Sequence, residues 1–309
     1  MNIVFMGTPD FAVPSLEILL SHGYTISAVV TAPDKPRGRG QQVSVTPVKE
    51  AALKHSLPVL QPDSLKDERF IDELKNLHAD LFVIVAFRIL PKEVYTIPPK
   101  GAFNLHASLL PKYRGAAPIN WAIINGEKET GVTSFFLQDK VDTGNIILSA
   151  RTTIRDDMNA GELHDVLSEI GAEIVLQTVR LIELGKAQPR PQDNSIATPA
   201  PKIFRETCRI NWDQPSKKIY DFIRGFSPYP AAWTIHNGKV IKIFRSRLKS
   251  DVGSQKSESG KIAVDQGKLF VSAVDGMLEI LELQQEGHKR MFTSEFLRGY
   301  KLKNGDLFR

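Results

Sequence analysis

The sequence has a single cysteine, Cys208, among 309 residues. One cysteine cannot form an intramolecular disulfide, and no cluster of Cys and His residues has the spacing of a zinc site. The composition is therefore typical of a protein from a reducing compartment that has neither a disulfide framework nor a structural metal. We expect Cys208 to be a small apolar core residue and expect no metal in the functional site.

The sequence also lacks a long apolar run. No stretch approaches the roughly 18 residues that a membrane span requires. Residues 2–6 begin a strand pattern directly, with no basic region before them and no cleavage site after them, so we expect no signal peptide. These absences predict a cytoplasmic protein that contacts no membrane, and nothing in the sequence calls for an obligate protein partner.

Charge is distributed unevenly along the chain. The whole chain carries a net charge of +5, whereas residues 207–309 contain 18 Lys and Arg against 11 Asp and Glu, a net charge of +7. The remaining residues therefore have a net charge of −2. A basic C-terminal region either binds an anionic partner or is a solvated surface, and the charge alone leaves both interpretations open.

Strand and helix patterns alternate through the first two thirds of the chain. Residues 2–6 and 25–31 are rich in β-branched or apolar residues, and residues 81–86 form a continuous apolar run typical of a central parallel strand. Residues 46–55 and 161–185 have helical patterns with capping signals or an amphipathic face. This alternation predicts a doubly wound, mostly parallel α/β sheet of Rossmann-like type.

The first strand and helix do not carry the dinucleotide fingerprint. Pro9 and Phe11 stand where that fingerprint requires glycines, so a pyrophosphate could not approach the backbone closely. We therefore expect no nicotinamide cofactor.

The C-terminal region has a different pattern. Four prolines lie among polar residues between 186 and 202, and about five short strand patterns follow, separated by turn signals such as Asn237-Gly238. This arrangement predicts a linker and then a small β-barrel. We place the α/β domain at 1–189, a linker at 190–206 and the barrel domain at 207–309.

Polar side chains lie at or just after the ends of two predicted strands. Alternate residues of a strand share a face, so Asn104 and His106 point the same way and Leu105 points to the opposite face. Asp142 follows the alternating run 131–138, and a second strand end can bring its carboxylate to the imidazole. Such a set can donate hydrogen bonds and move protons, although a capped strand end and an ordinary turn would leave the same pattern.

A basic segment follows the second predicted strand. Residues 33–42 contain two prolines, two glycines and three cations, among them Arg37 and Arg39, so we expect no regular structure there. The segment is either a solvated loop or an arm whose arginines contact phosphate groups.

Several blocks together resemble a known family. The runs 103–111 (FNLHASLLP), 113–119 (YRGAAPI) and 141–144 (VDTG) resemble the formyltetrahydrofolate-dependent formyltransferases. Within that family, the opening run 4–11 (VFMGTPDF), the basic loop and the appended C-terminal region are similar to the members that act on a tRNA.

The resemblance implies an activity and a site. The activity is transfer of a formyl group from 10-formyltetrahydrofolate to the α-amine of methionine on the initiator tRNA, and the C-terminal region would be an OB-like barrel that binds this tRNA. In this reading Asn104, His106 and Asp142 are catalytic. The stretch Ser108, Leu109, Leu110 and Pro111 binds the folate, and Arg37 and Arg39 contact the tRNA.

Two questions stay open at this point. Residues 87–91 (FRILP) depart from the commonest family pattern, so Arg88 is either exposed or paired with a folate carboxylate. The same catalytic set also serves transfer to an amino-sugar nucleotide, to glycinamide ribonucleotide or to another small amine. A non-catalytic RNA-binding protein would account for the basic barrel, but not for the complete Asn, His and Asp set.

Overall fold

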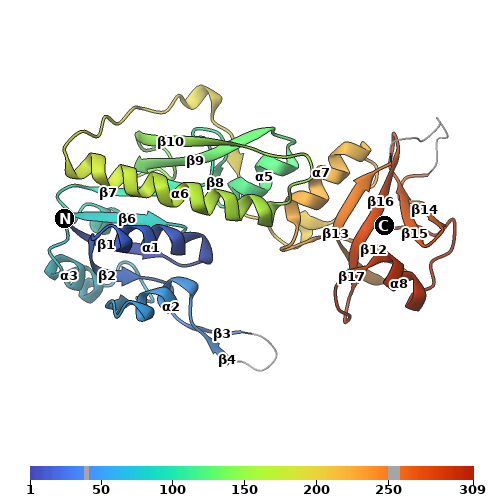
Figure 1. The fold of residues 1–309 in the computed structure, drawn as a ribbon, viewed down its shortest axis with the longest axis horizontal. Coiled ribbons are helices and arrows are strands. Elements are labelled where there is room, and N and C mark those ends of the chain that lie inside the picture. Colours follow the sequence, from blue (N-terminus) through green and yellow to red (C-terminus); the bar gives the residue numbers. More distant parts are fainter. Residues whose placement is uncertain (38–41, 250–257) are drawn as a thin grey trace. The chain divides into compact units, whose positions relative to one another are not determined.

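The protein is described by a computed structural model that covers residues 1–37, 42–249 and 258–309 (Figure 1). The chain forms two compact units. The first comprises residues 1–115, 130–152 and 164–199, and the second comprises 116–129, 153–163 and 200–309. Two segments from the middle of the chain thus belong to the second unit, and the domain boundaries at 189 and 206 stay a prediction.

The first unit is built on a seven-stranded sheet in the order β10-β9-β7-β6-β1-β2-β5 (Figure 1). Neighbours from β7 to β5 are parallel, and β9 runs antiparallel to β7. The prediction of a mostly parallel sheet is therefore confirmed. The strands are β1 (Asn2–Gly7), β2 (Thr25–Val30), β5 (Val59–Leu60), β6 (Leu81–Val85), β7 (Ala102–His106), β9 (Glu129–Phe136) and β10 (Ile146–Thr153).

Helices cover both faces of this sheet. On one face, Met6 and Ile84 pack in a buried cluster with Phe70 and Leu74 of α3 (Glu68–Asn76). Helix α6 (Ala160–Glu183) lies along the other face, beside β7. Within the described ranges, no helix is both long and apolar enough to cross a membrane. The remaining helices of the unit are α1 (Val13–Ser21), α2 (Pro47–Lys54) and the short α4 (Lys92–Tyr95).

Helix α2 shows how the local sequence sets an element boundary. Pro47 is the first helical residue, where its missing N–H costs no helical hydrogen bond. The hydroxyl of Thr46 accepts a hydrogen bond from the Lys49 N–H at 3.1 Å. The cap predicted for the helix at 46–55 is confirmed.

The expectation of no regular structure at 33–42 is wrong for residues 35–37 and for residue 42, which lie in strands. Strands β3 (Lys35–Arg37) and β4 (Gln42–Ser44) pair antiparallel, with Pro36 opposite Val43. A two-stranded ribbon accommodates a proline because one edge of each strand has no partner that needs its N–H. Arg37 is the last residue of β3, and Arg39 lies outside the described residues.

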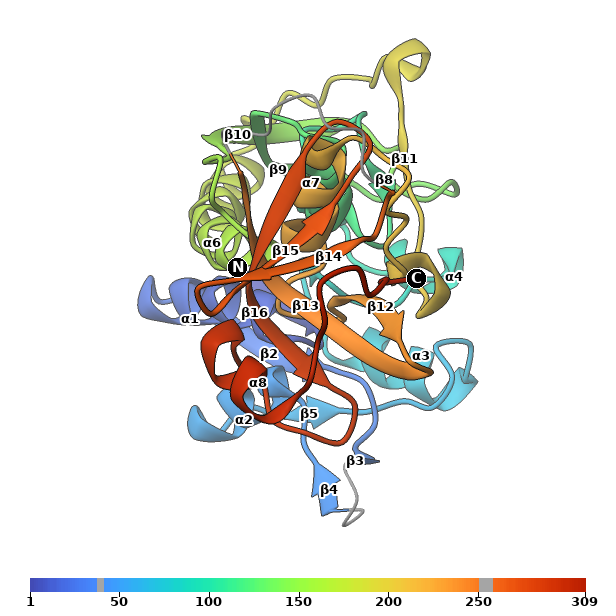
Figure 2. The ribbon, with the colours of Figure 1, turned by 90° about the vertical axis from the view of Figure 1, so that its right-hand side faces the viewer.

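The second unit contains an antiparallel sheet in the order β12-β13-β16-β15-β14 (Figure 2). Asn237 and Gly238 connect β12 to β13 with φ angles of 48° and 75°, as a two-residue hairpin turn requires. The prediction of a C-terminal antiparallel β domain is confirmed. Its strands are β12 (Ala232–His236), β13 (Lys239–Leu248), β14 (Ile262–Asp265), β15 (Lys268–Ser272), β16 (Met277–Gln285) and β17 (Met291–Phe292), which pairs with β16.

The last residues of the chain join the two edges of this sheet. The N–H of Ile262 in β14 donates to the Asp306 carbonyl at 2.7 Å. Ile235 in β12 exchanges both backbone hydrogen bonds with Arg309, at 2.8 and 3.0 Å. Phe308, 2% exposed, enters the core between these contacts and stacks on Trp212 with ring centres 6.0 Å apart. The segment 305–309 therefore closes the sheet around its apolar core, which α8 (Thr293–Gly299) also covers through Phe296.

Helix α7 (Ser216–Phe226) fixes the two mid-chain segments to the second unit. The Asn120 amide in α5 (Pro118–Ile124) donates to the Gly225 carbonyl at 2.7 Å, and a Cβ at Gly225 would lie 2.5 Å from the Ile124 side chain. The buried Arg224 guanidinium pairs with Asp221 and donates to the Met158 carbonyl at 2.8 Å. The segments 116–129 and 153–163 thus depend on α7 for their packing.

Closure by Phe308 can be tested by its removal. Phe308→Ala should lower the free energy of unfolding of the second unit by about 3 kcal/mol, because it empties a buried site. All three tryptophans belong to this unit, so tryptophan fluorescence during urea unfolding reports on it alone. Phe292→Ala, at a 65% exposed position, is the matched control and should change stability by less than about 0.5 kcal/mol. Equal effects of the two substitutions would contradict the proposed closure.

Candidate active site

Strand β7 presents Asn104 and His106 on one face of the sheet. Leu105 points to the opposite face, where it packs so closely on α6 that a Cβ at Gly171 would lie 2.7 Å from its side chain. Strand β7 lies between β6 and β9, so its backbone is fixed from both sides. The alternation predicted for this strand is the one that the structure shows.

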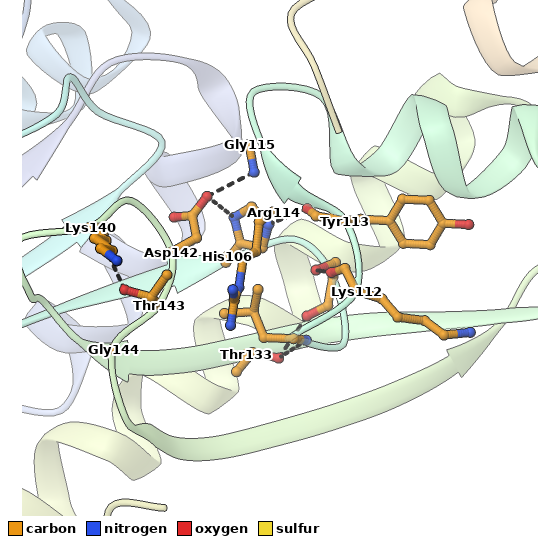
Figure 3. Close-up of polar contacts among 12 residues, drawn as sticks. His106, Lys112, Tyr113, Arg114, Gly115, Thr133, Lys140, Asp142, Thr143 and Gly144 are labelled. Carbon is orange, nitrogen blue, oxygen red and sulfur yellow. Dashed lines mark hydrogen bonds and ion pairs between the residues drawn. The ribbon is translucent and has the colours of Figure 1, made fainter. Parts of the chain in front are cut away.

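The imidazole of His106 has one nitrogen committed to the backbone. Its Nε2 lies 2.8 Å from the Tyr113 carbonyl oxygen, and the side chain is 7% exposed (Figure 3). Because a carbonyl oxygen only accepts hydrogen bonds, Nε2 carries a proton. In the neutral ring, Nδ1 therefore holds the lone pair and is the nitrogen that can gain or lose a proton.

Asp142 faces this second nitrogen. Its Oδ2 lies 3.9 Å from Nδ1 of His106, within ion-pair distance but too far for a direct hydrogen bond (Figure 3). The same oxygen accepts a hydrogen bond from the Gly115 N–H at 2.8 Å. The structure thus brings together the predicted histidine and aspartate, and a backbone amide holds the carboxylate beside the ring.

The Asn104 side chain is half-buried and lies two residues before His106. Within the described ranges, its amide group makes no hydrogen bond to another part of the chain. An amide offers two N–H donors and one acceptor, so Asn104 can donate to a ligand without breaking an existing contact.

Both residues that contact His106 have unusual backbone conformations. Tyr113 has a φ of 60° and Asp142 a φ of 54°, in the left-handed region that non-glycine residues seldom adopt. This conformation costs on the order of 1 kcal/mol per residue, more for a bulky tyrosine than for an aspartate, and it persists where surrounding contacts enforce it. Such strain on two sides of one imidazole supports a functional role for this place.

The loop that carries Asp142 lies directly against β9. A Cβ at Gly144 would be 1.6 Å from the Phe136 carbonyl oxygen, so only glycine fits this position. The Thr143 hydroxyl donates to the Lys140 carbonyl at 2.9 Å and tightens the turn before it. The run 141–144 is therefore a sharp turn whose glycine permits the close approach of the backbone.

Gln192 supports the same loop, and no sequence signal points to it because the residue lies in the predicted linker. Its Nε2 donates to the carbonyls of Asp142 and Gly144, at 2.9 and 2.8 Å. Its Oε1 accepts from the Arg114 guanidinium at 2.7 Å, and Arg114 also donates to Asn194. The amide thus connects the segment after His106 to the segment that carries Asp142.

The stretch predicted to bind folate is largely buried. The Ser108 hydroxyl donates to the Lys112 carbonyl at 2.6 Å, and the Ser108 carbonyl accepts from Thr133 at 2.7 Å. Leu110 and Pro111 are also buried, while Leu109 is half-buried and packs beside Gly131. The serine side chain is thus already used to shape the loop.

The Arg88 side chain contacts the protein backbone at residues 62 and 63. Its guanidinium donates to the carbonyls of Pro62 and Asp63, at 2.7 and 3.0 Å, and lies 5.4 Å from the Phe87 ring centre. Partial burial lowers the pKa of the Arg88 guanidinium. Its buried Nε has no hydrogen-bond partner among the described residues. These contacts fix the loop after β6, where the sequence departs from the family pattern.

Comparison with known families gives a clear match over both parts of the chain. The family model described as "Formyl transferase" matches residues 1–179, and that described as "Formyl transferase, C-terminal domain" matches residues 202–301. The chain belongs to the formyl transferase family.

Similar proteins agree with this assignment. The formyl transferase is 50% identical over 313 residues to the methionyl-tRNA formyltransferase of Bacteroides fragilis, covering 98% of this chain and 96% of the relative. It is 45% identical to that of Caldanaerobacter subterraneus subsp. tengcongensis, and each chain is fully covered.

Solved structures share the fold of this formyl transferase. One is WlaRD, a sugar 3N-formyl transferase with dTDP and 5-N-formyl-THF, at a TM-score of 0.69 and 22% identity, covering 94% of this chain and 99% of WlaRD. Another is HypX from Aquifex aeolicus in complex with tetrahydrofolic acid, at a TM-score of 0.66 and 18% identity, covering 100% of this chain and 51% of HypX.

The position of Gln192 predicts a measurable role. Gln192→Ala should lower kcat for formyl transfer by at least about tenfold, because a loop displaced by a fraction of an ångström misplaces Asp142. KM for the formyl donor should change little, and Gln188→Ala, at an exposed position in the same segment, should leave kcat unchanged. If both variants keep full kcat, Gln192 does not position the aspartate.

Proposed function

We propose that this formyl transferase moves the formyl group of 10-formyltetrahydrofolate to the α-amine of methionyl-tRNA. The observation that carries the proposal is an identity of 45 to 50% over nearly the full length to methionyl-tRNA formyltransferases, in a chain that has Asn104 and His106 on β7 and Asp142 3.9 Å from His106. The likeness to sugar N-formyltransferases, at 22% and 23% identity, reflects the fold alone. An amino-sugar nucleotide or another small amine is therefore the less favoured acceptor.

The reaction exchanges one C–N bond for another. The acceptor amine attacks the formyl carbon, and a tetrahedral intermediate forms with negative charge on oxygen and positive charge on the new nitrogen. The bond between the carbon and N10 of the folate then breaks, and one proton passes from the incoming amine to N10. The enzyme therefore has two tasks, which are to stabilise the oxyanion and to move the proton.

Asn104 and His106 fit the first task. The Asn104 amide is a neutral donor with no competing partner among the described residues, and protonated His106 is a charged one. Each positioned donor contributes about 3 kcal/mol when it acts on an oxyanion out of bulk water. Since the Tyr113 carbonyl holds Nε2, the nitrogen that works in this mechanism is Nδ1.

Asp142 fits the second task. At 3.9 Å from Nδ1, its carboxylate stabilises the imidazolium without a direct hydrogen bond. The side chain is 13% exposed, so solvent screens this interaction less than it would at the surface. We propose that Asp142 accepts and returns the proton that travels between the two nitrogens, directly or through one water, as a general base and acid.

The remaining substrate contacts are part of the same proposal. We propose that Leu109, Leu110 and Pro111 line the folate pocket, and that Ser108 holds the loop that carries them. Arg88, which the Pro62 and Asp63 carbonyls already engage, would shape the pocket rather than pair with a folate carboxylate.

We further propose that Arg37, Arg39 and the basic residues of 207–309 bind the phosphates of the initiator tRNA. The net charge of +7 over 207–309 supports this role. In this proposal residues 1–189 are the catalytic domain, 190–206 the linker and 207–309 the tRNA-binding domain. An aminoacylated tRNA acceptor would locate the reaction where translation takes place, in the cytoplasm.

The catalytic set predicts the behaviour of three variants. His106→Ala, Asp142→Asn and Asn104→Ala should each lower kcat by at least about 100-fold, because each group acts mainly in the transition state. Single-turnover formylation of methionyl-tRNA measures the effect, and circular dichroism checks the fold. His288→Ala, at an exposed position in the second unit, should retain full activity. If a folded variant without His106 keeps normal turnover, the proposed mechanism is wrong.

The acceptor can be identified by comparison under one salt condition. We expect kcat/KM for methionyl-tRNA to exceed that for glycinamide ribonucleotide and for an amino-sugar nucleotide, and preference for either small acceptor would overturn the assignment. Arg37→Ala and Arg39→Ala should each reduce the slope of log affinity against log salt by about 1 for the tRNA. Folate affinity should not change, and Arg69→Ala, at an exposed position of α3, is the matched control.

A further inference from the structure

A cleft of about 720 Å³ lies within the second unit, and the catalytic set is not part of it. Its walls come from the segment 202–208, from β12 and β13, and from the end of β16 with the turn at 286–287. Ala117 and Ala231 also line it. The volume is typical of a site for a small molecule or for one or two nucleotides.

Two aromatic rings stand exposed at this cleft. Phe204 is 58% exposed and Tyr229 is 82% exposed, although both line the cleft. The two rings are therefore gathered at one place instead of being scattered singly over the surface, which is the arrangement typical of a binding site. Open ring faces of this kind suit a planar ligand that stacks.

A third ring at the cleft is fixed in place. The indole N–H of Trp233 donates to the Arg205 carbonyl at 2.8 Å, and its residue pairs with Lys242 across β12 and β13. The guanidinium groups of Arg205 and Arg209 lie 5.9 and 5.6 Å from the centre of its ring. A ring held this way loses little conformational entropy when a ligand binds beside it.

The charged groups of the cleft are mostly cations. Among the described residues that line it, Lys202, Arg205 and Lys242 are cations and Glu286 is the single carboxylate. The Lys202 ammonium lies 5.6 Å from the centre of the Phe204 ring, so cation and ring face are adjacent. The Cys208 thiol in the wall is neutral, because burial raises its pKa to about 11. The cleft thus combines ring faces with an excess of positive charge.

We propose that this cleft binds an unpaired nucleotide of RNA, with its base stacked on Phe204 or Tyr229 and its phosphates on Lys202, Arg205 and Lys242. Ring faces beside cations are the means by which proteins bind single-stranded nucleic acid without reading its sequence. The base of a duplex is already stacked, so the cleft selects an unpaired segment. The inference rests on the proposed function, since a tRNA acceptor supplies such segments, and it adds a site that the catalytic mechanism does not require.

Binding of a short RNA to the full-length protein tests this site. The probe is an unstructured, end-labelled RNA of about eight nucleotides, a length that one OB-type domain can cover, and fluorescence anisotropy measures its Kd. Phe204→Ala and Tyr229→Ala should each weaken binding at least about fivefold, since stacking contributes about that much or more per base. Phe204→Trp should preserve affinity, whereas Phe204→Leu, which keeps apolar area without a ring face, should not.

Matched controls separate stacking from general effects. Phe292→Ala removes an exposed ring of the same unit outside the cleft, and it should leave the Kd unchanged. A duplex of the same sequence should bind with no dependence on Phe204 or Tyr229. Lys242→Ala should reduce the salt slope for the single strand by about 0.7, the value for one phosphate. Equal Kd values of the wild type, Phe204→Ala and Tyr229→Ala for the single strand would overturn the proposal. The proposal would also fail if these two substitutions weakened binding of the duplex as much as binding of the single strand.

The test distinguishes this inference from the function on which it rests. If the protein transfers the formyl group to methionyl-tRNA but binds the short RNA equally well with and without the Phe204 and Tyr229 rings, the proposed nucleotide site is wrong and the proposed function stands. If binding of the short RNA depends on the two rings but no formyl group is transferred to methionyl-tRNA, the nucleotide site is supported and the proposed acceptor is wrong.

Discussion

The hydrogen bond from His106 Nε2 to the Tyr113 carbonyl is the contact on which the rest of the site depends. It fixes the ring tautomer and turns Nδ1 toward Asp142. To form this hydrogen bond, the chain after β7 has to turn back so that Tyr113, seven residues later, reaches the His106 ring. Tyr113 adopts a left-handed backbone conformation in this turn. Backbone groups therefore hold both members of the pair, because the Gly115 N–H fixes the carboxylate in the same way.

Features encoded over a few residues were predictable from the sequence. The apolar run of β6, the alternation of β7, the cap at Thr46 and the turn at Asn237 each depend on side chains close in the chain, and the structure shows each of them. The pairing of His106 with Asp142 agrees with the expectation, but not for the reason of adjacent strand ends. Strand β9 is antiparallel to β7 and ends beside Phe103, so the loop after β9 has to carry Asp142 back to His106. The 3.9 Å separation and the role of the Tyr113 carbonyl were not predictable, because they depend on backbone angles.

Features that depend on distant segments were missed. Gln192 lies 50 residues from Asp142 in a proline-rich stretch, and an isolated glutamine there has no pattern that distinguishes it from solvated neighbours. The closure of the second sheet by residues 305–309 joins strands far away in sequence through backbone hydrogen bonds, which leave no mark on side-chain composition. The ribbon of β3 and β4 was missed for a related reason, since local proline content outweighed a pairing that tolerates proline.

The interleaved order of the two units limits how this protein can evolve. The chain passes from one unit to the other five times, so no single cut separates a complete second unit from a complete first one. A recombination event near residue 200 would join α7 of one ancestor to α5 of another, and Gly225 would then meet a foreign Ile124 at close range. Relatives should therefore exchange the C-terminal region only together with 116–129 and 153–163, and substitutions in these three segments should be correlated across the family.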